Sequence, residues 1–184
     1  VFDQYVDRVF NTSLVQVNWD KKLNETKPLI LQLAGQWITQ QAIQSGGNDN
    51  PINSYFDKGA TSQVFGFRLG FMKTNNWNLH VNYTRITGEG RYLMPREWGK
   101  DPMFTFMQRE RNEGFGNVHA MNLVAGKELG KSGWKIESSI GHFLLPDVKN
   151  YALNKYGIPS YAQFNFDLRY QFKGSFQGLN AQLL

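Results

Sequence analysis

The segment from Tyr161 to Lys173 reads "YAQFNFDLRYQFK", and its side chains alternate strictly in character. One alternate set is apolar and largely aromatic: Ala162, Phe164, Phe166, Leu168, Tyr170 and Phe172. The other set is polar: Gln163, Asn165, Asp167, Arg169 and Gln171. Because successive side chains of a β-strand point to opposite faces, this period of two predicts a strand with one apolar and one polar face.

The same period recurs along the chain and predicts an all-β fold of about eight strands. The polar phase carries Gln, Asn, Gly and isolated charges, rather than the mixture of Lys and Glu that is typical of a solvated surface. No segment shows a helical period of comparable quality. Besides the first segment, the predicted strands are Leu14–Asp20, Pro28–Gln40, Gln63–Lys73, Trp77–Thr84, His119–Lys127, Trp134–Gly141 and the start of "LNAQLL".

The connections between these strands alternate in length. Short connections rich in turn-forming residues fall at Lys21–Lys27, Thr74–Asn76, Leu129–Gly133 and Gly174–Gly178. Long connections fall at residues 42–62, 86–117 and 145–160. One plain end and one elaborated end are typical of a transmembrane antiparallel up-and-down β-barrel, with short periplasmic turns and long extracellular loops. We therefore interpret residues 1–184 as a single barrel domain with three extracellular loops.

Composition narrows the classes of partner. The 184 residues contain no cysteine, and the net charge of +5 is spread so that no basic run exceeds two residues. A nucleic-acid partner is therefore not expected. No window holds the run of about 18 apolar residues that a spanning helix needs. Aromatic residues near strand ends are predicted to form an interfacial girdle in contact with outer-membrane lipid: Trp19, Trp37, Trp77, Trp134, Tyr170 and Phe172.

The direction of the last strand predicts that the barrel is incomplete. If the long loops are extracellular, "LNAQLL" runs outward, whereas a bacterial barrel with both termini in the periplasm needs a further inward strand. We expect the chain to be a C-terminal portion of a larger barrel, with strands missing on both sides.

Two long segments resemble a known family. They read "RYLMPREWGKDPMFTFMQRERNEGFGNVHA" and "LLPDVKNYALNKYGIPSYAQFNFDLRYQFKGSFQGLNAQLL". They are similar to the OprD-like outer-membrane porins of Bacteroidetes-type bacteria, with mild departures at Lys100 and Gln108. The resemblance implies a barrel of about eighteen strands. It also implies passive passage of small, often carboxylate-bearing solutes along a basic ladder in the lumen.

The strand phases indicate which charges face that lumen. A charged side chain on the lipid face near the bilayer midplane costs roughly 2–4 kcal/mol for Arg or Lys, so the polar phase should face water. This predicts six pore-lining residues: Arg68, His80, Lys135, Glu137, Asp167 and Arg169. Asp167 and Arg169 are close enough to pair, which makes Arg68 the stronger candidate for selectivity.

The loop from Gly90 to Gly114 is long enough to fold back into the pore as a constriction. Its charges could create a transverse field that selects solutes, or they could pair with one another to brace the loop. The sequence favours neither interpretation over the other. The residues concerned are Arg96, Glu97, Arg109, Glu110, Arg111 and Glu113.

Three functions are compatible with these patterns. The first is an outer-membrane channel for passive diffusion of small polar or anionic solutes. The second is a structural or interaction barrel in a membrane assembly, plugged by its loops or by a membrane-protein partner. The third is a soluble lipocalin-like binder. No enzymatic centre, cofactor or metal site is predicted, since the three histidines lie on separate strands without nearby ligand spacing.

Overall fold

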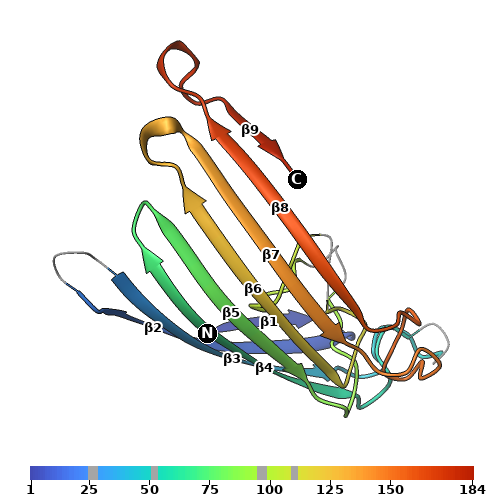
Figure 1. Cartoon of the computed structure of the whole chain (residues 1–184). Coiled ribbons are helices and arrows are strands. Elements are labelled where there is room, and N and C mark those ends of the chain that lie inside the picture. Colours follow the sequence, from blue (N-terminus) through green and yellow to red (C-terminus); the bar gives the residue numbers. More distant parts are fainter. Residues whose placement is uncertain (25–28, 51–53, 95–98, 109–111) are drawn as a thin grey trace.

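A computed structural model describes residues 1–24, 29–50, 54–94, 99–108 and 112–184. All of its strands belong to one antiparallel sheet, in which each strand pairs with its neighbours in sequence (Figure 1). The nine strands are β1 (Phe2–Val6), β2 (Phe10–Lys22), β3 (Leu29–Ala42), β4 (Thr61–Lys73), β5 (Trp77–Ile86), β6 (Val118–Glu128), β7 (Trp134–Leu144), β8 (Tyr161–Gln171) and β9 (Asn180–Leu183).

Each of the eight predicted strands is present, and β1 is additional. It pairs with β2 from Phe2↔Leu14 to Val6↔Phe10, and Arg8 turns the chain with a positive φ of 61°. In β1 apolar and polar side chains occur on the same face, because Phe2, Gln4 and Val6 are spaced two residues apart and point to one side of the strand. Its sequence therefore lacks the alternation on which the prediction depended.

The two ends of the sheet differ, as the connection lengths predicted. The connections β2–β3, β4–β5, β6–β7 and β8–β9 are at one end, and the long connections 43–60, 87–117 and 145–160 gather at the other (Figure 1). The turn between β1 and β2 is a short connection at the long-loop end. None of the helical segments in the described ranges has the length and apolar character that crossing a bilayer as a helix requires.

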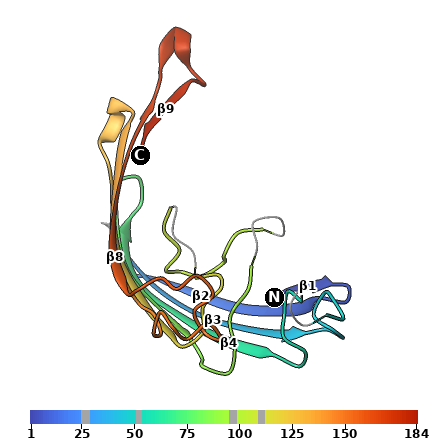
Figure 2. The same cartoon turned by 90° about the vertical axis from the view of Figure 1, so that its right-hand side faces the viewer.

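The sheet curves strongly, and the described parts of the 87–117 loop rise into its concave side (Figure 2). The phase that faces away from this loop exposes its large apolar side chains; Phe67 is 56% exposed and Phe164 is 66% exposed. The aromatic phase is therefore the convex surface of the sheet and not a soluble core. The polar phase of the strands faces the concave side.

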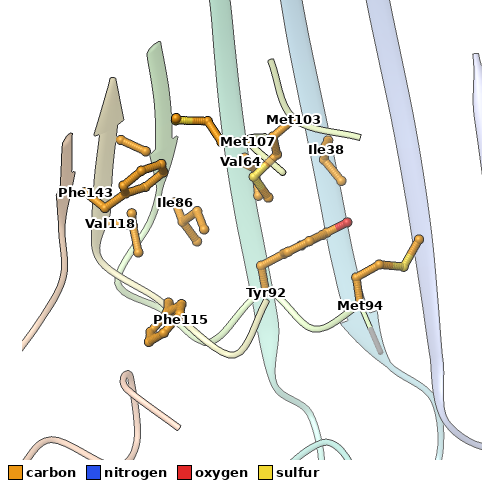
Figure 3. Packing of buried hydrophobic residues seen from close by; sticks show 11 residues of the cluster. Ile38, Val64, Ile86, Tyr92, Met94, Met103, Met107, Phe115, Val118 and Phe143 are labelled. Atoms are coloured by element: carbon orange, nitrogen blue, oxygen red, sulfur yellow. The ribbon is translucent and has the colours of Figure 1, made fainter. Parts of the chain in front are cut away.

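The main hydrophobic core lies between the concave face and the 87–117 loop (Figure 3). Strands β3 to β7 contribute Ile38, Val64, Ile86, Val118, Ala120 and Phe143, and the loop contributes Tyr92, Met94, Met103, Met107 and Phe115. A second, smaller cluster joins Phe10, Phe56 and Leu93. Both clusters lie at the long-loop end, so the loops are packed onto the sheet there.

Candidate pore-lining site

A chain of hydrogen bonds crosses the concave face from β4 to β6. Arg68 Nε donates to Asn82 Oδ1 at 2.6 Å, and Asn82 Nδ2 donates to Asn122 Oδ1 at 2.6 Å. The three residues are aligned by register, since Arg68 pairs with Asn82 and Asn82 pairs with Asn122. Both amides are buried, whereas Arg68 remains half-buried. The relay fixes the guanidinium on the concave face at the centre of the sheet.

The 87–117 loop covers one side of Arg68. The Phe104 ring lies under the guanidinium, with 4.7 Å between Arg68 Cζ and the ring centroid. This cation–π contact holds the guanidinium plane against the loop. Because the guanidinium of arginine is always protonated in proteins, Arg68 places a permanent positive charge where the loop meets the open part of the concave face.

Side-chain amides of β3 hold the first half of the loop. Gln40 is fully buried; its Nε2 donates to Leu93 O at 2.8 Å and its Oε1 accepts from Leu93 N at 2.9 Å. Gln36 Nε2 donates to Pro102 O at 2.9 Å. The two glutamines thus replace the backbone partners that an irregular segment lacks inside a folded protein.

The second half of the loop is held by β5, β7 and β8. Thr105 Oγ1 donates to Thr84 Oγ1 at 2.8 Å, and Gln108 O accepts from the side chains of Gln163 and Asn165. Gly141 permits the close approach of the loop, because a Cβ there would lie 2.5 Å from Met107 Sδ. The described loop therefore crosses the concave face from β3 to β8.

Glu113 joins the three long loops. It is 3% exposed, and its carboxylate accepts from Tyr55 Oη at 3.2 Å, from Lys155 Nζ at 3.3 Å and from Tyr156 Oη. Tyr55 belongs to the 43–60 loop, and Lys155 and Tyr156 belong to the 145–160 loop. The bracing interpretation had the charges of the Gly90–Gly114 loop pair with one another, whereas these partners of Glu113 belong to the two other loops. The other predicted loop residues, Arg96, Glu97, Arg109, Glu110 and Arg111, lie outside the described residues.

The remaining predicted pore-lining residues lie on the concave face nearer the short turns. Arg169 donates to Asp167 through Nε at 2.9 Å and also through a terminal nitrogen, and Gln182 Nε2 donates to the same carboxylate at 2.9 Å. Cross-strand register places Lys135 opposite Arg169 and Glu137 opposite Asp167. His80 lies opposite Gly70 on the same face. The structure thus separates Arg68, which forms no salt bridge with any described residue, from a mixed-charge group around Asp167.

The predicted girdle residues occupy two levels of the convex face. Trp77, Trp134, Tyr170 and Phe172 lie at the short-turn end, where the rings of Trp134 and Tyr170 are 4.5 Å apart. Trp19 lies inside β2 rather than at its end, and Trp37 lies inside β3 towards the long loops. The alternation predicts that these side chains lie on the apolar face of the sheet. It does not predict how far along the strand each one lies, because the strands extend beyond the segments in which the alternation is clear.

Sequence reasoning missed the residues that position Arg68 and the loop. Asn82 and Asn122 fall on the polar phase of their strands, but the sequence alone indicates no role for them, nor for Gln36, Gln40 and Phe104. A detectable signal was present, since neutral amides recur on the inward phase of β3, β5 and β6. Among the described residues, no cluster of His, Asp and Glu has the arrangement of a metal site.

Comparison with known proteins identifies the fold. No protein-family model matches the chain, and no curated protein matches it. Among solved structures, Pseudomonas aeruginosa OccK10 (OpdN) is similar with a TM-score of 0.76 and 11% identity, over 98% of this chain and 48% of the other. Acinetobacter baumannii OccAB4 is similar with a TM-score of 0.73 and 13% identity, over 98% and 41%. Pseudomonas aeruginosa OpdK, solved with vanillate, is similar with a TM-score of 0.72 and 10% identity, over 98% and 44%.

These neighbours are OprD-like β-barrel porins of the outer membrane of Gram-negative bacteria. The chain spans less than half of their length. At identities this low the likeness concerns the fold, and it agrees with the curved, sequentially ordered sheet. The chain has the fold of a partial antiparallel β-barrel of the outer-membrane porin type.

Proposed function

We propose that this chain forms part of the wall and the constriction of an outer-membrane channel for small polar or anionic solutes. The whole barrel would have about eighteen strands and would lie in the outer membrane of a Gram-negative bacterium. The finer assignment to a Bacteroidetes-type, OprD-like protein depends on the two sequence segments "RYLMPREWGKDPMF" and "LPDVKNYALNKYG".

Arg68 is the observation that carries this proposal. Its guanidinium is held by Asn82 and Phe104 at the edge of the loop that crosses the concave face. The terminal nitrogens of Arg68 have no acceptor among the described residues, so they remain available to a carboxylate in a bidentate arrangement. A fixed donor of this kind beside a narrowing would favour anions over cations of the same size.

Carboxylate-bearing solutes are the proposed substrate class. OpdK was solved with vanillate, an aromatic carboxylate. In the present chain, a carboxylate bound to the terminal nitrogens of Arg68 would lie in the guanidinium plane at its edge, while the Phe104 ring lies against one face of that plane. We therefore expect small organic acids to interact with Arg68 more strongly than chloride does, because their two oxygens match the guanidinium fork.

Planar-bilayer recordings of the whole protein test this function. The wild-type protein should give open-channel current with a preference for anions, and Arg68→Gln should lower the anion-to-cation permeability ratio severalfold. The double variant Asp167→Asn/Arg169→Gln is the matched control, since it removes an ion pair on the same face without changing the net charge. An unchanged ratio in Arg68→Gln would contradict the role of Arg68.

The plugged structural barrel is the second candidate. It is favoured by the close-packed cluster between the loop and the concave face, which occupies space that a wide channel would leave to water. Absence of current from correctly folded wild-type protein would support this candidate against the channel.

A further inference from the structure

A shallow apolar groove crosses the convex face of β2 to β5. Its volume is about 510 Å³. The convex surface is shown from the side in Figure 2, on the far side of the sheet from the 87–117 loop. The side chains that border the groove include Val17, Leu33, Phe67, Leu69, Val81 and Tyr83.

Gly35 creates this groove. It faces outward between Val17 on β2 and Phe67 on β4, with which it is in register. A Cβ at Gly35 would meet no atom within 4 Å. Since strands lie about 4.8 Å apart, the flanking side chains are roughly two strand spacings apart across the gap, which suits a single hydrocarbon chain.

Two basic side chains lie at the long-loop end of the groove. Tyr83, which borders the groove, has its hydroxyl 2.7 Å from His119 Nδ1. Arg85 is opposite His119 in the strand register, and its guanidinium is held by Asn117 Oδ1 at 2.8 Å and Val118 O at 3.2 Å. Within the described part of the chain, neither Arg85 nor His119 forms a salt bridge.

Glu89 is an acidic residue that interacts electrostatically with Arg85. Its pKa is lowered first by a hydrogen bond to Thr87 and also by the Arg85 charge. Its side chain is exposed in the loop beyond β5, and it is not among the residues that border the groove. Val118 and Asn117 take two of the five N–H donors of the Arg85 guanidinium, so other donors remain for an anion.

We propose that this groove binds one phosphate-bearing lipid, with an acyl chain over Gly35 and the phosphate against Arg85, His119 and Tyr83. The apolar floor and the cationic end match the two parts of such a lipid, which a second protein copy with the same basic end would not match as well. This inference rests on the membrane location in the proposed function, but it does not depend on channel activity.

Native mass spectrometry of the whole protein in detergent tests the site. The probes are phosphatidylglycerol and phosphatidylethanolamine with identical acyl chains. We expect wild-type protein to retain one lipid and to favour the anionic phosphatidylglycerol. Gly35→Leu should lower retention of both lipids about tenfold, because the new side chain occupies the chain position. Gly35→Ala should give a smaller loss, which keeps the test informative if the leucine variant folds poorly.

Matched controls separate groove filling from a general change of the convex face. Ala125→Leu places the same leucine side chain at an exposed, outward-facing position of β6, and it should leave retention unchanged. Arg85→Gln should lower the preference for phosphatidylglycerol about fivefold, whereas Lys127→Gln at the opposite end should not.

Three outcomes would overturn the proposal: no retained lipid on wild-type protein, equal effects of Gly35→Leu and Ala125→Leu, or a wild-type dimer that Gly35→Leu dissociates. Bilayer conductance of the same preparations distinguishes this failure from failure of the channel. Normal current without lipid retention would contradict only the lipid site.

Discussion

The concave face has two regions that share strands but differ in what covers them. In the covered region, near the long loops, Gln40, Val64 and Phe143 are fully buried beneath the 87–117 loop. In the open region, near the short turns, Asp20 and Arg169 are exposed and Gln32 is half-buried. The same alternation of side chains therefore produces a packed core at one end and a charged surface at the other.

The comparison shows that strand phase determines direction, whereas the loop determines environment. Amides in the covered region bind loop backbone, as Gln40 does with Leu93. Amides in the open region bind other side chains, as Gln32 does with Asp20 at 3.3 Å. Removing one partner of a buried hydrogen bond is costly, because the other partner is then left with neither a protein partner nor water. Substitutions in the two regions should therefore have unequal effects on the free energy of unfolding.

Phe143→Ala should have the largest effect on the covered region. Phe143 is fully buried in the core cluster, and its ring stacks on Tyr161 with 4.9 Å between centroids. Truncation should destabilise the docked loop by about 3–5 kcal/mol. Limited proteolysis within residues 87–117 measures this change. Phe164→Ala, on the exposed convex face of the neighbouring strand, is the control, and equal cleavage rates in both variants would contradict a core at this position.

Gln40→Leu should have the next largest effect. It leaves the buried N–H and C=O of Leu93 without their side-chain partners, at a cost of about 2–3 kcal/mol. Gln32→Leu makes the same change on the same face of β3 in the open region, where the effect should stay below about 0.5 kcal/mol. Thermal or denaturant unfolding of both variants measures the difference. Similar losses in the two variants would remove the distinction between the regions.

The strands could be predicted from the sequence because alternation is a local property. Phe164, Asn165 and Phe166 already show which side chains share a face, and the structure places them so. β1 was missed because Phe2 and Gln4 share a face, so short-range alternation gives no signal there. Some strands extend a few residues beyond their predicted ends. For example, β7 ends at Leu144 rather than at Gly141, because backbone pairing continues where the alternation of side chains is no longer clear.

The site could be predicted only in part. Arg68 was assigned to the lumen by its phase, and it does lie on the concave face. Its contact with Phe104 and the contact between Gln40 and Leu93 join residues far apart in the sequence, and no period or spacing connects them. The partners of Glu113 come from two other loops for the same reason. Long-range loop docking depends on shape and on unpaired backbone groups, which a single sequence does not display.

Glu113→Gln should have a smaller effect, on the joint between the loops. The substitution keeps the size of the side chain but removes the charge that Lys155 and Tyr156 contact. Lys155 is partly exposed and can regain water, so the expected loss is about 1–2 kcal/mol. A double-mutant cycle with Lys155→Met, followed by loop proteolysis, isolates the pair. A coupling energy near zero would show that Glu113 does not join the loops through Lys155.

Asp167→Asn should have the smallest effect, and it concerns selectivity in the open region. Removing the Asp167 charge leaves Arg169 with an uncompensated positive charge, so the anion preference of the proposed channel should rise. The rise should be less than about twofold, because Arg169 is exposed and solvent and salt screen its charge. Arg68 is held beneath the loop beside Phe104, where screening is weaker, so Arg68→Gln should change the permeability ratio more. If Asp167→Asn had the larger effect on reversal potential, selectivity would reside in the open region, and the covered region would serve only to hold the loop.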